Sequence, residues 1–313
     1  MTSKVTARAP SSTANIGPGF DVFGLALDAF YDTVTLEVLQ THGLQVEVRG
    51  EYGKAIPLQP DANAAGLVIK KMSEERNVEK GLKVIVEKGV PAGFGLGSSA
   101  ASAAAAVVAF NAMFDLNLDR NSLIRYAAMG EVASAGTMHY DNVSASLLGG
   151  FVIVRIEPLN VVKIDAPQDL VLCVAIPKIN VPQKKTEVSR SVLPAQVSLM
   201  QLTSNVSNAC TVVAGFMLSD VELIAKGVND VIVEPARMHL IPGYEQVKKG
   251  ALDAGALAVA ISGAGPSMIA FAKAGKDEGK ICKAMEDGFK SANTDSKAIA
   301  CRPSEGAKVV ERN

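Results

Sequence analysis

The chain has 313 residues, 48% of them hydrophobic, and its 31 basic and 32 acidic residues give a formal net charge of -1. This length suits two domains of ordinary size, and the balanced charge provides no overall attraction to nucleic acid or to an anionic membrane. The apolar segments are short and are interrupted by Gly, Pro or charged residues, which argues against a membrane span. The first ten residues lack the apolar stretch of a signal peptide, so we expect a soluble, cytoplasmic protein.

The cysteines indicate no metal site. They lie far apart in the chain, include no Cys-x-x-Cys pair and have no cluster of histidines nearby to complete a zinc site. We expect reduced, mostly structural thiols at Cys173, Cys210, Cys282 and Cys301.

The first half of the chain alternates between strand and helix patterns. Apolar residues with a period of two predict half-buried strands around residues 34–38, 44–48 and 82–86. Helical patterns predict helices over residues 64–76, 98–113 and, from an N-cap at Asp119, to about residue 134. The second of these helices is rich in alanine, so it can pack very close to its neighbours.

A strand over residues 151–156 is followed by Pro158 and Pro167, where the composition suggests a domain junction. We therefore predict domains 1–157 and 158–313. Beyond the junction, strands are predicted over residues 170–176, 256–261 and 268–272, and helices over 196–218, 244–254 and 277–290. The whole pattern predicts an α+β protein without internal repeats.

Residues 91–101, Pro-Ala-Gly-Phe-Gly-Leu-Gly-Ser-Ser-Ala-Ala, connect a strand to the alanine-rich helix. Glycines let the backbone approach a ligand closely, and the first turn of a helix offers unpaired N–H groups, so this segment could bind phosphate. Spacing alone leaves a structural turn equally open, and neither the Walker nor the Rossmann glycine pattern fits. The two serines at the helix start could cap the helix or ligate magnesium beside a phosphate.

The loop resembles the central motif of the GHMP kinases, Pro-x-x-x-Gly-Leu-Gly-Ser-Ser-Ala. The two further motifs of that family have counterparts in the right order, residues 10–27 and the segment Ser262-Gly-Ala-Gly-Pro-Ser267. The resemblance implies a two-domain GHMP kinase fold, with an N-terminal domain like the second domain of ribosomal protein S5 and a ferredoxin-like C-terminal domain. It also implies a phosphotransferase that uses ATP and Mg²⁺, and a homodimer is plausible by the same resemblance.

The resemblance assigns ATP contacts, which in the loop fall on Pro91, Gly93, Gly95, Leu96, Gly97, Ser98, Ser99 and Ala100. Outside the loop it adds Thr186, with Asn63 and Lys88 near the adenine and the phosphate-side motif glycines Gly263 and Gly265. Lys88 could equally be a solvent-facing strand end. Glu131 lies on the apolar face of its helix, where a salt bridge or a frayed helix end would explain a carboxylate. The resemblance instead pairs it with Ser99 on the magnesium.

The first motif has the form found in the homoserine kinase branch of the family, which acts in threonine biosynthesis. In that branch Asp21 would hold the amino group of L-homoserine beside Asn15, and Arg190 and Arg237 would bind its carboxylate, for which a planar guanidinium is the best partner. The alternatives are a turn cap for Asp21 and solvated surface positions for the arginines. His139 and Asn142 would also face the substrate, or else be a satisfied loop histidine and an Asx turn.

Other interpretations stay open at this point. Another small alcohol of the mevalonate or shikimate type could be the acceptor, and a phosphate loop alone would also suit a non-catalytic nucleotide-binding protein. We expect transfer without a dedicated catalytic base, Asp141 being the local carboxylate that could contradict this.

Overall fold

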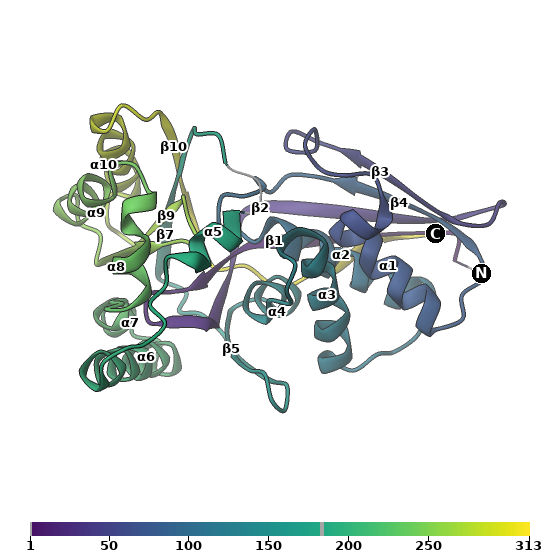
Figure 1. The fold of residues 1–313 in the computed structure, drawn as a ribbon, viewed down its shortest axis with the longest axis horizontal. Helices are drawn as coiled ribbons and strands as arrows, with labels where there is room; N and C mark the ends of the chain where they lie inside the picture. Colours follow the sequence, from purple (N-terminus) through teal and green to yellow (C-terminus); the bar gives the residue numbers. More distant parts are fainter. Residues whose placement is uncertain (1, 182–184) are drawn as a thin grey trace.

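The computed structural model describes residues 2–181 and 185–313. Figure 1 shows an elongated molecule in which a large sheet with helices on one face lies beside a smaller sheet with its own helices. This confirms the expected α+β architecture, and the two sheets are described in turn below.

The larger sheet has seven strands in the order β11-β1-β2-β4-β3, with β5 pairing to β2 and β6 to β5. Its strands are β1 (Lys4–Asn15), β2 (Gly19–Leu39), β3 (Leu44–Arg49), β4 (Gly81–Glu87), β5 (Phe151–Arg155), β6 (Asn160–Ile164) and β11 (Lys308–Arg312). The three early strands predicted from alternation are confirmed as parts of β2, β3 and β4. β3 and β4 run parallel because a helix connects them, whereas the other pairs are antiparallel.

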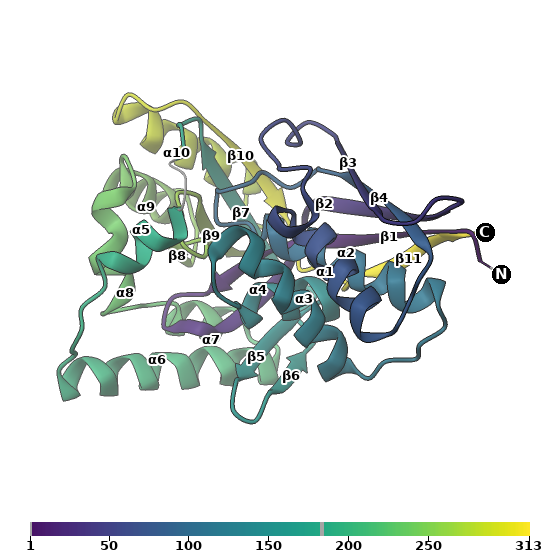
Figure 2. The same cartoon turned by 45° about the vertical axis from the view of Figure 1, so that its right-hand side comes forward.

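Four helices cover one face of this sheet (Figure 2). They are α1 (Ala64–Glu75), α2 (Ser98–Met113), α3 (Arg120–Ala135) and α4 (Tyr140–Leu148), with the short 3₁₀ helix η1 (Pro60–Ala62) ahead of α1. The alanine-rich α2 has the predicted bounds and is almost wholly buried between the sheet and the other helices. Asp119 caps α3 as predicted, because its side chain accepts a hydrogen bond from Ser122 N.

The smaller sheet is antiparallel with the order β10-β7-β9-β8, the ferredoxin-like arrangement. It consists of β7 (Leu170–Pro177), β8 (Ala258–Ile261), β9 (Met268–Lys273) and β10 (Ser296–Cys301), and α9 (Tyr244–Asp253) and α10 (Glu278–Ser291) pack on one face. β7 is a continuous apolar run because both of its faces are buried. Val171 and Cys173 face those two helices, whereas Leu170 and Leu172 belong to the core that continues into the larger sheet.

The remaining helices lie between β7 and α9 in the chain. They are α5 (Lys185–Ser191), α6 (Leu199–Leu218), α7 (Val221–Gly227), α8 (Val233–Arg237) and the 3₁₀ helix η2 (Met238–Leu240). Phe216 of α6 stacks on Phe151 of β5 with ring centroids 4.0 Å apart, so one apolar core spans both sheets. In the part of the chain that the structure describes, we find no helix with the length and apolar character needed to cross a membrane.

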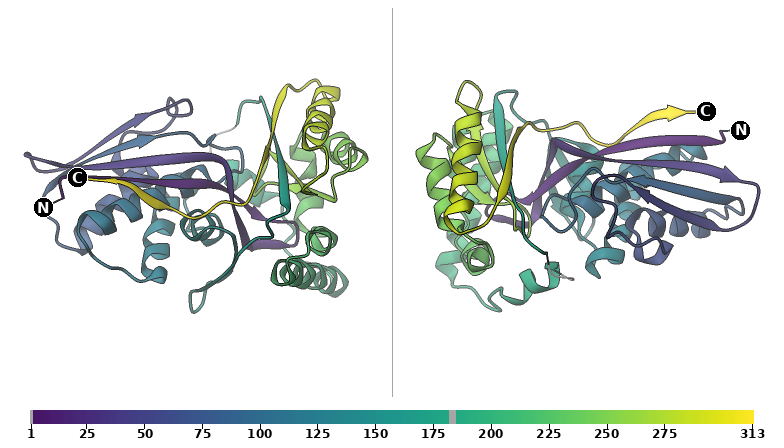
Figure 3. Two further views of the ribbon diagram at one scale, coloured as in Figure 1. Left: turned by 180° about the vertical axis from the view of Figure 1, so that it is seen from behind. Right: turned by 90° about the horizontal axis from the view of Figure 1, so that it is seen from above.

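The chain crosses between the sheets more than once. Two strands beyond residue 157, β6 and β11, hydrogen-bond into the larger sheet. Figure 3 shows β11 running back along β1, so that the two termini lie at the same end of the molecule. The division into domains 1–157 and 158–313 stays a prediction.

Candidate active site

The three sequence motifs meet in space, although they are far apart in the chain. The hydroxyl of Ser262 in the third motif donates to the carbonyl of Gly95 at 2.8 Å and shares a hydrogen bond with the hydroxyl of Thr13 at 2.9 Å. The backbone N–H of Ser12 in the first motif donates to the carbonyl of Leu96 at 3.1 Å. The first and third motifs therefore hold the glycine-rich loop from two sides.

The glycines of this loop are required by both backbone conformation and space. Gly95 and Gly97 have φ values of +76° and +65°, which favour glycine. A Cβ atom on Gly95 would lie 2.1 Å from the Ser262 carbonyl, and one on Gly97 would lie 2.1 Å from Ser12 Oγ. Gly97 is also the N-cap of α2, so the loop leads directly into the N–H groups of the first helical turn.

The loop borders a cavity of about 300 Å³. The predicted site residues that line it are Asn15, Asp21, Asn63, Lys88, Gly93, Gly95, Leu96, Gly97, Ser98, Ser99, Glu131, His139, Asn142, Thr186, Arg190, Arg237 and Gly263. Three other predicted contacts do not line the cavity: Pro91, Ala100 and Gly265. Sequence positions from eight separate segments are thus brought to one place, and their roles as ligand contacts stay predictions.

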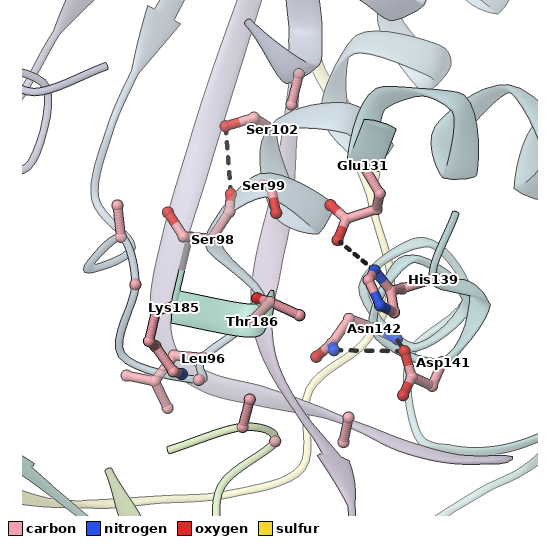
Figure 4. Close-up of a pocket in the computed structure, with 18 of the residues that line it drawn as sticks. Leu96, Ser98, Ser99, Ser102, Glu131, His139, Asp141, Asn142, Lys185 and Thr186 are labelled. Atoms are coloured by element: carbon pink, nitrogen blue, oxygen red, sulfur yellow. Dashed lines mark hydrogen bonds and ion pairs between the residues drawn. The ribbon is translucent and has the colours of Figure 1, made fainter. Parts of the chain in front are cut away.

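Glu131 lies inside α3 and is 6% exposed, opposite Ser99 in the first turn of α2 (Figure 4). Burial raises the pKa of the Glu131 carboxyl to about 7, and a hydrogen bond with Ser99 opposes that shift. His139 Nδ1 is 4.0 Å from a carboxylate oxygen of Glu131, so the salt-bridge alternative would require a protonated His139. A divalent cation would stabilise this buried carboxylate, so Ser99 and Glu131 are suitable ligands for magnesium.

Metal binding by protein groups alone has no support. Within residues 2–181 and 185–313, no cluster of three or more His, Cys, Asp or Glu side chains could hold a metal ion. A site built on Ser99 and Glu131 would therefore need further oxygens from phosphate and water, which is the usual situation for magnesium in phosphate-transferring enzymes.

Asp21 and Arg190 form an ion pair in the cavity wall, with distances of 2.8 and 2.7 Å from one guanidinium nitrogen to the two carboxylate oxygens. Arg190 is therefore held in an ion pair, although 37% of its side chain is exposed. Phe20, which sequence reasoning missed, lies between the two arginines, with its ring centroid 5.3 Å from Arg190 Cζ and 5.2 Å from Arg237 Cζ. Its place next to Asp21 in the first motif was the available signal.

Arg237 of α8 is 3% exposed and donates to the carbonyls of Ser189 at 3.0 Å and Gly263 at 3.4 Å. Burial, and then the charge of Arg190, lower the pKa of Arg237 to about 10. Among the described residues, no acidic side chain forms an ion pair with Arg237. A buried guanidinium of this kind is a favourable partner for an anionic ligand.

The side-chain amide of Asn15 forms hydrogen bonds with other parts of the protein. Its nitrogen donates to Gly263 O at 2.8 Å and its oxygen accepts from Asp21 N at 3.1 Å. Asn15 and Asp21 both have positive φ values, 69° and 58°. Asn15 thus joins the first motif to the third and orients the Asp21 backbone, a positioning role beside the predicted substrate contact.

Lys88 differs from the sequence interpretation. It is 2% exposed, so the solvent-facing alternative is wrong. Its ammonium forms a short hydrogen-bonded ion pair with Asp32 and donates to Ser98 O and Ser102 Oγ, both at 2.9 Å. These three contacts occupy all three of its N–H donors. Lys88 also lines the cavity, and its contact with adenine stays a prediction. Lys88 instead ties the end of β4 to the first turn of α2.

Asn63 is also engaged in local structure. It is the N-cap of α1, where its side-chain oxygen accepts from Gly66 N at 3.0 Å and its nitrogen donates to Pro57 O at 2.9 Å. One N–H of the amide is left over for another partner, so a contact with adenine is compatible with the cap.

His139, Asp141 and Asn142 lie at the start of α4, on the cavity side (Figure 4). Burial lowers the pKa of His139, which favours the neutral imidazole. Asn142 accepts from Ser12 Oγ at 3.0 Å and so braces the loop at Gly97, while its N–H donates to Asp141 at 2.7 Å. Asp141 is 3% exposed, and burial raises its pKa to about 6.

Lys185 is a second lining residue that sequence reasoning missed. It is the first residue of α5, next to the predicted Thr186, and its ammonium makes a short hydrogen bond to the carbonyl of Gly265. The sequence around it has no feature that marks one lysine as special.

Comparison with known proteins agrees with this architecture. The family model described as "GHMP kinases N terminal domain" matches residues 63–150, and the one described as "GHMP kinases C terminal" matches residues 212–291. The chain belongs to the GHMP kinase family.

Among its relatives are proteins named homoserine kinase. Those of Thermoplasma volcanium and Saccharolobus solfataricus are 44% and 41% identical, over 83% and 98% of this chain and 82% and 98% of theirs. The crystal structure of a homoserine kinase from Cytophaga hutchinsonii superposes with a TM-score of 0.92 and 37% identity, covering 99% of this chain and 98% of the other.

Proposed function

We propose that this protein transfers the γ-phosphate of ATP to the hydroxyl group of L-homoserine, giving ADP and O-phospho-L-homoserine in threonine biosynthesis. Members of the GHMP kinase family use ATP, and the homoserine kinases named above support this acceptor. The observation that carries the substrate assignment is the presence of Asp21, Arg190 and Arg237 in the cavity that the phosphate loop borders. A free amino acid has one positive and one negative group, and these side chains offer a partner for each.

In the proposed complex, the loop from Gly93 to Ala100 and the first turn of α2 bind the phosphates of ATP with backbone N–H groups. Ser99 and Glu131 would hold Mg²⁺, which when bound neutralises negative charge on the phosphates. Asp21 would bind the ammonium of the acceptor, and the two arginines its carboxylate. Fixing both ends of the acceptor directs its hydroxyl, which is where most of the rate enhancement in phosphoryl transfer arises.

The chemical step forms a bond between the acceptor oxygen and the γ-phosphorus and breaks the bond from that phosphorus to the ADP oxygen. As the new bond forms, the hydroxyl proton passes to a phosphoryl oxygen or to water. We propose that no dedicated base removes it, because the transition state of such transfers is loose and the hydroxyl loses its proton late. Asp141 is the alternative, since it is the buried carboxylate next to Asn142. We also propose a homodimer, from the family resemblance.

The experiment is an assay of acceptor-dependent ADP release, with ATP and magnesium, across homoserine, mevalonate, shikimate and galactose. We expect homoserine to give by far the largest turnover, with O-phosphohomoserine as product. Equal or greater turnover with mevalonate would refute the substrate while leaving the family intact. ATP binding without turnover on any acceptor would favour the non-catalytic alternative.

A further inference from the structure

Lys185 lies beside the phosphate loop without belonging to any of the three motifs. Its ammonium donates to the carbonyl of Gly265, and a Cβ atom on Gly95 would lie 2.8 Å from that same carbonyl oxygen. The ammonium is therefore close to the middle of the loop. Figure 4 draws Lys185 on one side of Ser99 and Glu131 on the other.

The charge around Lys185 is unusual for a lysine that is partly buried. Among the described residues, no acidic side chain forms an ion pair with it, and the charge that acts on it most strongly is the positive one of Arg237. Removal from water and the repulsion by Arg237 lower the pKa of Lys185 to about 7. A backbone carbonyl compensates such a cation only in part, so an anion in the cavity would stabilise it.

We propose that Lys185 is a further ATP-binding residue, whose ammonium contacts the phosphate chain from the side of the loop opposite the Ser99–Glu131 pair. This inference rests on the proposed use of ATP. The phosphates then lie between Lys185 on one side and the Ser99–Glu131 pair on the other. The competing interpretation is purely mechanical: Lys185 holds α5 against Gly265 and contributes no charge to the ligand.

The two interpretations predict different effects on nucleotide binding. If Lys185 contacts the phosphates, loss of its charge should weaken the binding of ATP but not of adenosine. Calorimetric binding of ATP and of adenosine, without acceptor, should be measured for the wild type and for Lys185→Gln, Lys185→Met and Lys185→Arg. Glutamine keeps an N–H donor for the Gly265 carbonyl but removes the charge. Lys178→Met is the control, because Lys178 is exposed and lies in the same connection between β7 and α5.

We expect Lys185→Gln and Lys185→Met to weaken ATP binding about 10- to 100-fold, the range for a lost hydrogen bond to a charged group. Adenosine binding should change less than about threefold, because adenosine has no phosphate. Lys185→Arg should retain most of the ATP affinity, and Lys178→Met should behave like the wild type.

Equal weakening for ATP and adenosine, or an unchanged ATP affinity in Lys185→Gln, would overturn the proposal. If Lys185→Met fails to fold, the glutamine and arginine variants still give the comparison. A wild-type protein that does not bind ATP would refute the proposed function itself. A protein that binds ATP but does not phosphorylate homoserine would leave the result for Lys185 intact.

Discussion

Arg190 donates from one guanidinium nitrogen to both carboxylate oxygens of Asp21, a residue 169 positions away in the chain. The sequence assigns these two residues to opposite ends of a substrate, but in the structure they neutralise each other. We expect the ammonium and carboxylate of homoserine to exchange for this pair, so that each residue changes partner when the substrate binds.

The pair itself should contribute little to stability. Both side chains are more than a third exposed, at 37% and 36%, and solvent screens such pairs to about 0.2–1 kcal/mol. A double-mutant cycle with Asp21→Asn and Arg190→Gln, measured by urea unfolding, should therefore give a coupling energy in that range. Asp21→Asn should nevertheless raise the KM for homoserine at least about tenfold, with little change for ATP, because it removes the partner of the ammonium. A large coupling energy with normal homoserine kinetics would make the pair structural.

Glu131→Gln should damage turnover far more than folding. The replacement keeps size and removes the charge that would bind magnesium, so kcat should fall at least about 100-fold at limiting magnesium. The melting temperature should stay the same or rise, because a neutral amide costs less to bury than the carboxylate. Full activity of the variant at limiting magnesium would show that the metal assignment is wrong.

Arg237→Leu should discriminate between acceptors with and without a carboxylate. Truncating one partner of a buried charge pair costs about 2–5 kcal/mol, so kcat/KM for homoserine should fall tens-fold to thousands-fold. The decarboxylated amino alcohol has no such pair to lose, and its kcat/KM should be nearly unaffected, as should ATP affinity.

Arg237 also donates to the carbonyls of Ser189 and Gly263, so its loss could loosen the site as a whole. Arg237→Lys serves as the matched variant, because it keeps a positive charge and a donor. Parallel losses on both acceptors would assign Arg237 a structural or phosphate-binding role instead.

Lys88→Met should reduce stability rather than nucleotide recognition. The change leaves the Asp32 carboxylate, which is 0% exposed, without its cation, and breaking a buried pair in this way costs about 3–5 kcal/mol in the free energy of unfolding. Lys83→Met is the control on the same strand, since the Lys83–Glu47 pair is partly exposed and should cost under about 1 kcal/mol. Normal stability combined with a selective loss of ATP affinity would instead support the predicted contact of Lys88 with adenine.

The lowered pKa of Lys185 should make the free energy of unfolding depend on pH. Its pKa falls from 10.5 to about 7 on folding, so between these values the unfolded chain binds more protons than the folded chain. Its contribution to the free energy of unfolding should therefore rise with pH across that window, and Lys185→Met should lack that rise. Urea unfolding of both proteins at several pH values measures the difference, and identical slopes would contradict the shifted pKa.

ATP should reverse that shift, because phosphate charges favour the protonated ammonium. At about pH 8, ATP binding to the wild type should therefore take up a fraction of a proton, seen as a dependence of the calorimetric enthalpy on the ionisation enthalpy of the buffer. The positive charge of Arg237 opposes this proton uptake. Because Lys185→Met keeps Arg237, a difference between the two proteins reports on Lys185 itself. An equal proton uptake in that variant would assign the effect to another group.

Local features of the sequence were enough for most of the fold. Periodicity of apolar side chains and helix capping depend on residues a few positions apart in the chain. The sequence therefore predicted the alternation in β2, β3 and β4, the bounds of α2 and the Asp119 cap. β11 was not predicted. All five of its residues are exposed, so it has no alternation, and it is a strand because the edge of β1 offers it hydrogen bonds.

In the site, too, some features follow from local sequence and others depend on tertiary contacts. The glycine loop and its two companion motifs were recognised from contiguous residues, and the resemblance they carry supplied the candidates that line the cavity. The sequence alone did not decide that Lys88 would be buried, because that depends on the pairing of β2 with β4, which brings Asp32 beside it. Nor could it reveal the Asp21–Arg190 pair or the isolated charge of Lys185. Burial and ion pairing depend on contacts between distant parts of the chain, and these exist only once the three motifs have packed together.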